Sequence, residues 1–99
     1  MSEFRIEFDW DPAKERSNRT KHGISFEAAM AVFRDPLAVT ILDNASSGEE
    51  RWVTLGQAAD GGLILVVHTW IETYEGAAKA RIISARRPTR REARQYREI

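Results

Sequence analysis

The stretch KARIISARRPTRREARQY, residues 79–96, decides how the chain is organised. Ile82 and Ile83 stand among small residues near its start, which predicts a β-strand over residues 79–85. The remainder predicts a helix over about residues 90–98. A strand end that leads several arginines into a helix start is a plausible place to hold a polyanion. The arginines of the stretch are Arg81, Arg86, Arg87, Arg90, Arg91 and Arg94.

The junction between this strand and this helix carries clear boundary signals. Thr89 suits the N-cap of a helix, and Glu92 follows three positions later, which is the spacing of a capping box. Pro88 continues neither a strand ladder nor a helix, so it predicts a sharp corner. We therefore expect the arginines beside Pro88 to lie where a strand end and a helix N-terminus converge.

Composition limits the class of protein. Ninety-nine residues, 42% of them hydrophobic, predict a single domain over residues 1–99. The sequence has no cysteine, which rules out disulfides and thiolate metal sites and favours a reducing compartment. The longest apolar run, residues 63–67, is too short to span a membrane, and the first residues do not resemble a signal peptide. We expect a cytoplasmic protein without a membrane partner.

A net charge of zero hides an asymmetry between the two parts of the chain. Residues 1–60 carry eleven acidic and seven basic side chains, whereas residues 61–99 carry four acidic and eight basic ones. Such an asymmetry indicates a basic face for nucleic acid or for an acidic partner. The plainer alternative is a solvated, arginine-rich helix with no partner.

The first part of the chain predicts one strand and two helices. Residues 4–10 alternate apolar and charged side chains, which is typical of a half-buried strand. Asp11 and Pro12 predict the start of a helix over residues 12–22, which is polar on nearly every side. A second helix is predicted over residues 26–34, since its apolar residues share one face.

The remaining residues predict strands joined by short connections. We expect strands at residues 37–42, 50–57, 63–71 and 78–85, with a loop at 43–48 and turns at 59–62 and 72–76. Strands joined by short turns run antiparallel. The predicted fold is α+β in the order β-α-α-β-β-β-β-α. Its mainly antiparallel sheet is packed by two N-terminal helices and a C-terminal helix.

Two sets of motifs carry a resemblance to a known family. The first is FDWDPAK at residues 8–14 and NRTKHGISFEAA at residues 18–29, followed by VF at 32–33 and DP at 35–36. The second is EERWVTLG at 49–56, RIISARR at 81–87 and RRE at 90–92, with Tyr96 beyond. In this order the motifs resemble the BrnT family of toxins from type II toxin–antitoxin systems.

This resemblance implies a RelE-like fold and an endoribonuclease that cuts RNA and so inhibits translation and growth. It also implies a BrnA-type antitoxin as partner. That antitoxin binds operator DNA, so the toxin would meet the operator only through it. One segment departs from the expected tight hairpin: residues 69–78 are longer and add Trp70 and Tyr74 near a possible RNA path.

RNA cleavage without a metal needs a base for the ribose 2′-hydroxyl, an acid for the leaving 5′-oxygen and cations around the reacting phosphate. Arginine suits the last role because its planar fork binds two phosphate oxygens and stays charged. The catalytic candidates of this kind are Arg51, Arg81 and Arg86. The candidates for binding the RNA backbone are Arg87 and Arg90.

Each of the main arginine candidates has a plainer alternative. Arg81 lies within a strand, where it could pair with an acid such as Glu50. Arg51 follows two acidic residues and could form a surface ion pair. Arg86 and Arg87 could both lie in solvent.

The histidines and one tyrosine complete the candidates. His22 follows Lys21 at a helix C-terminus, within the family motif. We therefore predict that His22 acts as acid or base and that Lys21 acts as a phosphate cation or proton carrier. Simple capping of the helix is the alternative for His22. His68 and Tyr96 are candidates for substrate binding. A lone histidine in an apolar strand is more often a satisfied core residue, and Tyr96 could simply pack by its ring. Two distant histidines form no metal motif, so we expect neither a metal nor a cofactor.

Two other functions stay open at this level. The chain could be a binding module that grips RNA or its antitoxin without cutting, or a structural subunit with no affinity for RNA. RNA binding without cleavage would favour the first of these, and its salt dependence would identify phosphate contacts.

Overall fold

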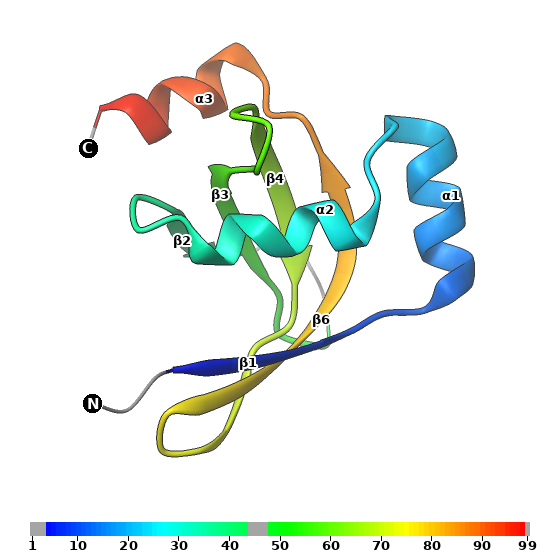
Figure 1. Cartoon of the computed structure of the whole chain (residues 1–99), viewed down its shortest axis with the longest axis vertical. Coiled ribbons are helices and arrows are strands. Elements are labelled where there is room, and N and C mark those ends of the chain that lie inside the picture. Colours follow the sequence, from blue (N-terminus) through cyan, green and yellow to red (C-terminus); the bar gives the residue numbers. More distant parts are fainter. Residues whose placement is uncertain (1–3, 44–47, 99) are drawn as a thin grey trace.

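The structure, a computed structural model, describes residues 4–43 and 48–98. Residues 44–47 of the predicted loop lie outside the described residues. In chain order the elements are β1 (Arg5–Asp9), α1 (Pro12–His22), α2 (Phe26–Met30), the 3-10 helix η1 (Ala31–Arg34), β2 (Val39–Leu42), β3 (Trp52–Gln57), β4 (Leu63–His68), β5 (Ile71–Tyr74), β6 (Ala77–Arg86) and α3 (Arg90–Arg97). Figure 1 shows α2 crossing one face of the sheet, with α1 beside it and α3 at one end.

The described strands form one six-stranded sheet with the order β1-β6-β4-β3-β2, and β5 also pairs with β6. The pairs β2–β3, β3–β4, β4–β6 and β5–β6 are antiparallel, and β1 runs parallel to β6. The predicted α+β class and the mainly antiparallel sheet are therefore confirmed. The long strand β6 is central because its first half pairs with β1 and β5 and its second half pairs with β4.

The predicted element order is wrong by one strand. We expected a strand over residues 63–71 and a turn over 72–76, but β4 ends at His68 and β5 occupies Ile71–Tyr74. All four residues of β5 are exposed, so no apolar alternation marks this strand in the sequence. Its backbone hydrogen bonds to β6 define it, and Gly76 with φ of 84° makes the tight turn between the two strands.

The core lies between the sheet and the segment formed by α2 and η1. Its buried residues are Ile24, Phe26, Ala29, Val32, Ile64, Val66, Ile82 and Ala85. Apolar residues of α2 and η1 meet apolar side chains of β4 and β6 here, which is how an amphipathic helix buries its stripe. Of the two predicted N-terminal helices, the second therefore covers the sheet as expected.

The first helix, α1, packs against β6 through one buried polar residue. The Asn18 Nδ2 donates to the carbonyl oxygens of Ile24 at 3.2 Å and Ala85 at 2.8 Å, and its Oδ1 accepts from the Ala85 N–H at 3.1 Å. The amide thus pairs with β6 much as a neighbouring strand would. Asn18 explains how so polar a helix is held against the sheet.

The opposite face of the sheet is only partly covered. Leu55 and Leu65 are buried there, while Ile41 is 57% exposed. Glu92 and Gln95 of α3 line a hollow with these side chains. The predicted capping box at the start of α3 is confirmed, since Thr89 and Glu92 exchange both hydrogen bonds.

Candidate functional site

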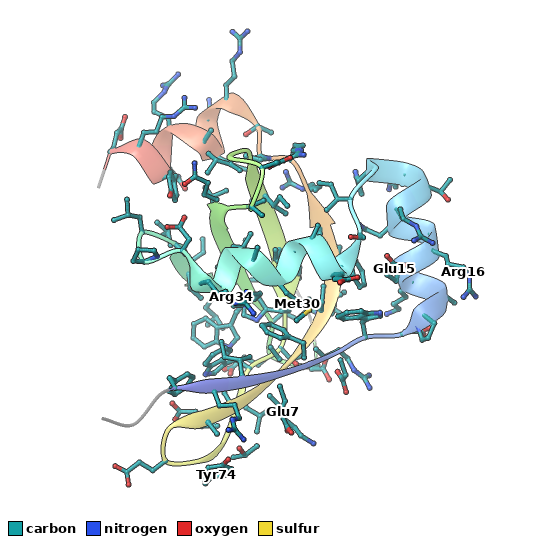
Figure 2. The ribbon with its side chains drawn as sticks, in the orientation of Figure 1. Glu7, Glu15, Arg16, Met30, Arg34 and Tyr74 are labelled. Atoms are coloured by element: carbon teal, nitrogen blue, oxygen red, sulfur yellow. The ribbon has the colours of Figure 1, made fainter. Side chains whose placement is uncertain are left out.

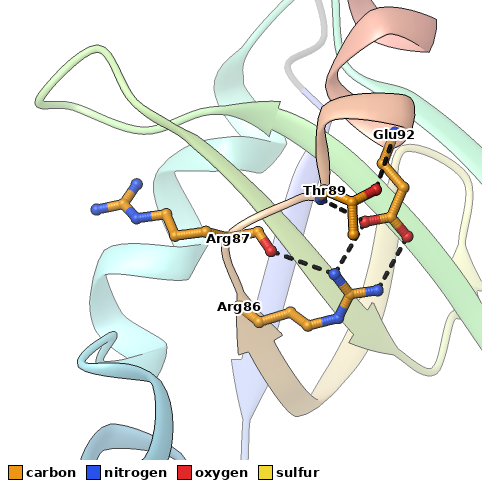
Figure 3. Close-up of polar contacts among 4 residues, drawn as sticks. All are labelled: Arg86, Arg87, Thr89 and Glu92. Carbon is orange, nitrogen blue, oxygen red and sulfur yellow. Dashed lines mark hydrogen bonds and ion pairs between the residues drawn. The ribbon is translucent and has the colours of Figure 1, made fainter.

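The basic corner comprises Arg86, Arg87, Pro88, Thr89 and Glu92, at the junction of β6 and α3 (Figure 3). The Arg86 guanidinium makes two parallel hydrogen bonds to the Glu92 carboxylate, Nη1 to Oε1 and Nη2 to Oε2, both at 2.9 Å. Glu92 Oε1 also accepts from the Thr89 N–H at 2.9 Å. Arg86 therefore does not lie free in solvent, and its charge is directed at Glu92.

This pairing changes the electrostatics of the corner. The hydrogen bonds from Arg86 hold the pKa of Glu92 at about 2, below its ordinary value of 4.5, and the Thr89 N–H adds to the effect. The same hydrogen bond raises the pKa of Arg86. A bidentate arginine–carboxylate pair is geometrically specific and strong. A phosphate that binds Arg86 must share its guanidinium with Glu92 or displace that carboxylate.

Arg87 points away from Arg86. Its Nη1 donates to the Leu63 carbonyl oxygen at 3.2 Å, and its Nη2 lies 3.7 Å from an Asp60 carboxylate oxygen. The Arg87 side chain is 53% exposed, so the ion pair with Asp60 is largely screened by solvent. Arg87, Arg19 and Gly23 line one hollow of about 590 Å³.

Lys21 and His22 form the last turn of α1, which ends at the left-handed Gly23 with φ of 72°. Lys21 is exposed and His22 is half-buried. Gly23 lines the same hollow as Arg87, whereas Lys21 and His22 are not among the residues that line it. The grouping of Lys21, His22 and an arginine in one site therefore stays a prediction.

Arg81 lies apart from the basic corner. Five residues of extended strand separate Arg81 from Arg86, which corresponds to about 17 Å. The Arg81 Nε is 3.5 Å from a carboxylate oxygen of Asp9 on the parallel neighbour β1, so Asp9 is the partner where we had named Glu50 as an example. Arg81, Arg86 and Arg87 therefore do not surround one phosphate in this structure.

Arg51 lies at the same end of the sheet as Arg81. Trp52 pairs with His68, which pairs with Ile82, so Arg51 and Arg81 flank one row across three strands and are separated by about 10 Å. The Arg51 Nε is buried and has no hydrogen-bond partner among the described residues. An unpaired buried guanidinium N–H is costly and unusual.

His68 is a satisfied core histidine, which is the plainer alternative for this residue. It is 1% exposed, with Nδ1 2.8 Å from the Thr69 carbonyl oxygen and Nε2 2.7 Å from the Thr54 hydroxyl. Burial lowers the pKa of the His68 imidazole, against a smaller raising effect of the Thr69 carbonyl. With both nitrogens engaged, the ring has no free polar atom for RNA, so the predicted direct substrate contact does not fit its position.

Tyr96 and Arg90 lie on α3. The Tyr96 hydroxyl donates to Asp35 Oδ2 at 2.5 Å, and Asp35 also accepts from the backbone N–H of Leu37 and of Gln57. The hydrogen bond from Tyr96 lowers the pKa of Asp35, and the same bond raises the pKa of Tyr96. Tyr96 thus ties α3 to the segment after η1, while Arg90 is exposed.

A feature that the sequence analysis missed is the aromatic hollow, a cavity of about 440 Å³ on the helix-covered face of the sheet. Alternation along β3 could have shown that Trp52 and Thr54 share a face, but nothing in the sequence places them beside β1. We define the hollow by Phe4, Phe33, Thr40, Trp52, Thr54, His68 and Trp70.

Two further properties concern the described part of the chain. No three histidine, aspartate or glutamate side chains within residues 4–43 and 48–98 group closely enough to hold a metal ion. No helix in those ranges is long and apolar enough to cross a membrane.

The chain has an α+β fold with arginines clustered around its sheet. This geometry makes it a candidate nucleic-acid-binding protein. The family model described as the ribonuclease toxin BrnT of type II toxin–antitoxin systems matches residues 10–92. The chain belongs to this family, so the resemblance found in the sequence is confirmed. As a toxin of this class it has RNA as substrate and an antitoxin as partner.

The solved structures include a similar fold, the ribonuclease toxin BrnT of Brucella abortus. It matches with a TM-score of 0.51 and 18% sequence identity, and the match covers 88% of this chain and 99% of that chain. At this identity the likeness concerns the fold. No curated protein sequence matches the chain at a significant level.

Proposed function

We propose that the chain is an endoribonuclease that cuts RNA without a metal ion, inhibits translation and is neutralised by a BrnA-type antitoxin. The family match carries this proposal. It spans residues 10–92 and therefore includes all the predicted site residues except Tyr96. The assignment of catalytic roles rests on Lys21 and His22 at the end of α1 and on Arg87.

The proposed reaction uses the ribose 2′-hydroxyl as nucleophile. Its oxygen attacks the adjacent phosphorus as its proton leaves to a base, the bond from phosphorus to the 5′-oxygen breaks, and an acid protonates that oxygen. The products are a 2′,3′-cyclic phosphate and a 5′-hydroxyl. We assign His22 to proton transfer, and Lys21 and Arg87 to the charge on the phosphate, because α1 ends at Gly23, which lines one hollow with Arg87.

The other candidates receive roles along the RNA. Arg51 and Arg81 would contact backbone phosphates away from the basic corner. Arg86 would act only where RNA competes with Glu92 for its guanidinium. Arg90 is exposed on α3 and would add a further phosphate contact.

The antitoxin is proposed to cover the exposed side of α1 and so close the hollow beside Arg87. α1 is polar on nearly every side, and within it Asn18 is the buried residue. Operator DNA would be bound by the antitoxin and not by this chain. Titration with antitoxin should suppress RNA cleavage in parallel with complex formation.

The direct test is cleavage of single-stranded RNA by the purified chain in EDTA. His22→Ala should lower the cleavage rate by about 100-fold or more, as expected for loss of a general acid or base. Lys14→Ala, on the exposed first turn of the same helix, is the matched control and should cut like the parent. Dependence on added metal, or products without a cyclic phosphate, would contradict the proposed chemistry.

A non-catalytic binding module is the second candidate. The pairing of Arg86 with Glu92 favours it, since this contact engages the guanidinium of a predicted catalytic residue. This alternative predicts salt-sensitive RNA binding with no cleavage by either the parent chain or His22→Ala.

A further inference from the structure

The aromatic hollow is built from residues that are distant in the sequence. Phe4 comes from the chain before β1, Phe33 from η1 and Thr40 from β2. Trp52 comes from the start of β3 and Trp70 from the connection between β4 and β5. Its volume of about 440 Å³ lies within the usual range for small-molecule sites. The lining is mostly apolar, so the occupant must offer a large apolar surface.

The walls of the hollow are aromatic rings in defined orientations. Phe4 and Trp70 are stacked, with ring centroids 5.9 Å apart and an angle of 5° between their planes. Phe33 and Trp70 each meet the His68 ring edge to face, with centroids 4.8 Å and 6.2 Å away. Phe4 is nevertheless 53% exposed, so one side of the stack is open to a planar ligand.

A chain of hydrogen bonds gives the hollow a defined polar character. A carbonyl oxygen only accepts, so His68 Nδ1 donates to Thr69, and Nε2 must accept from the Thr54 hydroxyl. The Thr40 hydroxyl, 2.8 Å from that of Thr54, then donates to Thr54. Every proton in the chain is committed, and Thr40 Oγ1 is left as an acceptor. The hollow therefore selects a ligand that carries an N–H or O–H donor.

Two cations stand beside the hollow. Arg5 and Arg34 line an adjoining cavity that shares Phe4, Ile6 and Phe33 with the aromatic hollow. Figure 2 shows Arg34 on the side of the helix that faces β1. Within the described parts of the chain, neither arginine belongs to an ion pair. Both charges are thus available to an anion attached to the ligand.

We propose that the aromatic hollow binds one unpaired nucleobase of RNA, with the base stacked on Phe4 and Trp70, its amino group donating to Thr40, and a neighbouring phosphate on Arg5 and Arg34. This proposal rests on the proposed action on RNA and deepens it by naming the group that is recognised. Stacking on aromatic side chains and arginine contacts to phosphate are the usual means of holding single-stranded RNA.

An apolar side chain of the antitoxin is the rival occupant. It would fill the volume but would make no hydrogen bond to Thr40 Oγ1 and no ion pair with Arg5 or Arg34. A base with an attached phosphate uses the apolar walls, the acceptor and the cations together, so the observations favour the nucleobase.

The test measures binding of 2′-O-methyl oligonucleotides, which cannot be cut by 2′-hydroxyl attack, through quenching of tryptophan fluorescence. Trp70→Ala should weaken binding by about tenfold, the lower range for a lost base stack. Phe4→Ala is a second stacking variant at an exposed position and should also weaken binding. Trp10→Phe is the matched control, because Trp10 packs on Phe26 outside the hollow, and it should bind like the parent.

The hydrogen bond from the base amino group to Thr40 is tested by comparing the affinities for oligoadenylate and oligocytidylate with the affinity for oligouridylate. Thr40→Val keeps the side-chain volume but removes the acceptor, and should lower the preference for the amino-bearing bases by about threefold to tenfold. Thr73→Val, on the exposed strand β5, should leave the preference unchanged. Arg34→Ala should weaken all oligonucleotides alike and reduce the dependence of affinity on salt.

The outcomes separate this proposal from the proposed catalysis. Base-selective binding that depends on Trp70 and Thr40 supports the hollow as a base site, even if the parent chain cuts no RNA. Cleavage by the parent, with binding and base preference unaltered in Trp70→Ala, Phe4→Ala and Thr40→Val, would overturn it. Loss of antitoxin binding in these variants, with RNA binding intact, would assign the hollow to the antitoxin and also overturn it.

Discussion

The basic corner and the aromatic hollow use charge in opposite ways. The corner is rich in arginine, but Arg86 is engaged by Glu92 and Arg87 lies near Asp60. The hollow has few charged neighbours, yet Arg5 and Arg34 beside it make no ion pair among the described residues. The number of arginines in a segment therefore does not measure the charge available to a nucleic acid. What matters is which arginines already have a carboxylate partner.

The largest expected effect concerns the attachment of α1, which carries the proposed acid–base residue. Asn18→Leu has a similar volume but leaves the N–H and carbonyl oxygen of Ala85 unpaired. The free energy of unfolding should fall by about 2–4 kcal/mol, since more than one buried polar group loses its partner. Urea denaturation measures this, with Ser17→Ala on the exposed side of α1 as control. Equal stabilities would show that α1 is held by other contacts.

The second prediction concerns how much the pair of Arg86 and Glu92 in the basic corner contributes to stability, and at which pH. The pKa of Glu92 is depressed in the folded state, to about 2 against an ordinary 4.5. The pair therefore stabilises the fold fully above pH 4.5, and this contribution is lost as pH falls from 4.5 towards 2. Allowing for solvent screening, we expect Arg86→Ala to cost about 1–2 kcal/mol at pH 7.

At pH 2 the difference between the parent and Arg86→Ala should be much smaller. Unfolding by urea at both pH values measures the two differences. A difference that does not shrink on acidification would mean that Arg86 contributes through packing and not through its pair with Glu92.

The third prediction asks whether RNA reaches the corner. Glu92→Gln removes the negative charge that engages Arg86, so RNA affinity should rise by a few fold and the salt dependence should steepen by about one phosphate contact. Glu75→Gln, exposed in the turn after β5, changes net charge by the same amount far from the corner. If both variants gain the same affinity, the gain comes from net charge and Arg86 has no special role.

The smallest expected effect is that of Tyr96→Phe. This change removes one hydrogen bond to Asp35, so it should lower the midpoint of thermal unfolding slightly, and by less than Arg86→Ala. RNA cleavage at a temperature well below that midpoint should be unchanged. A clear loss of cleavage at unchanged stability would restore the predicted role of Tyr96 in substrate binding.

Local chemistry was predictable wherever neighbouring residues in the sequence decide the structure. The capping box of Thr89 and Glu92 and the start of α1 at Asp11 and Pro12 both follow from short-range rules and are confirmed. The predicted resemblance to BrnT toxins is also confirmed, while the RelE-like relationship, the cytoplasmic location and the roles of individual site residues stay predictions.

The sequence could not predict β5, because a strand exposed at every residue has no apolar alternation and exists only through its pairing with β6. The predicted strand over residues 79–85 implied a separation of Arg81 from Arg86, but the sequence could not predict that Arg81 pairs with Asp9 of β1. An extended strand places Arg81 in the middle of β6 and Arg86 at its end.

The sequence by itself determined the class of fold, the boundaries of most elements and the family, because periodicity, caps and ordered motifs are local properties of the chain. Only the tertiary structure decided which charges are free and which side chains enclose the aromatic hollow. Those properties depend on partners distant in the sequence, such as Asn18 with Ala85 and Phe4 with Trp70. Packing brings such partners together, and no local pattern records it.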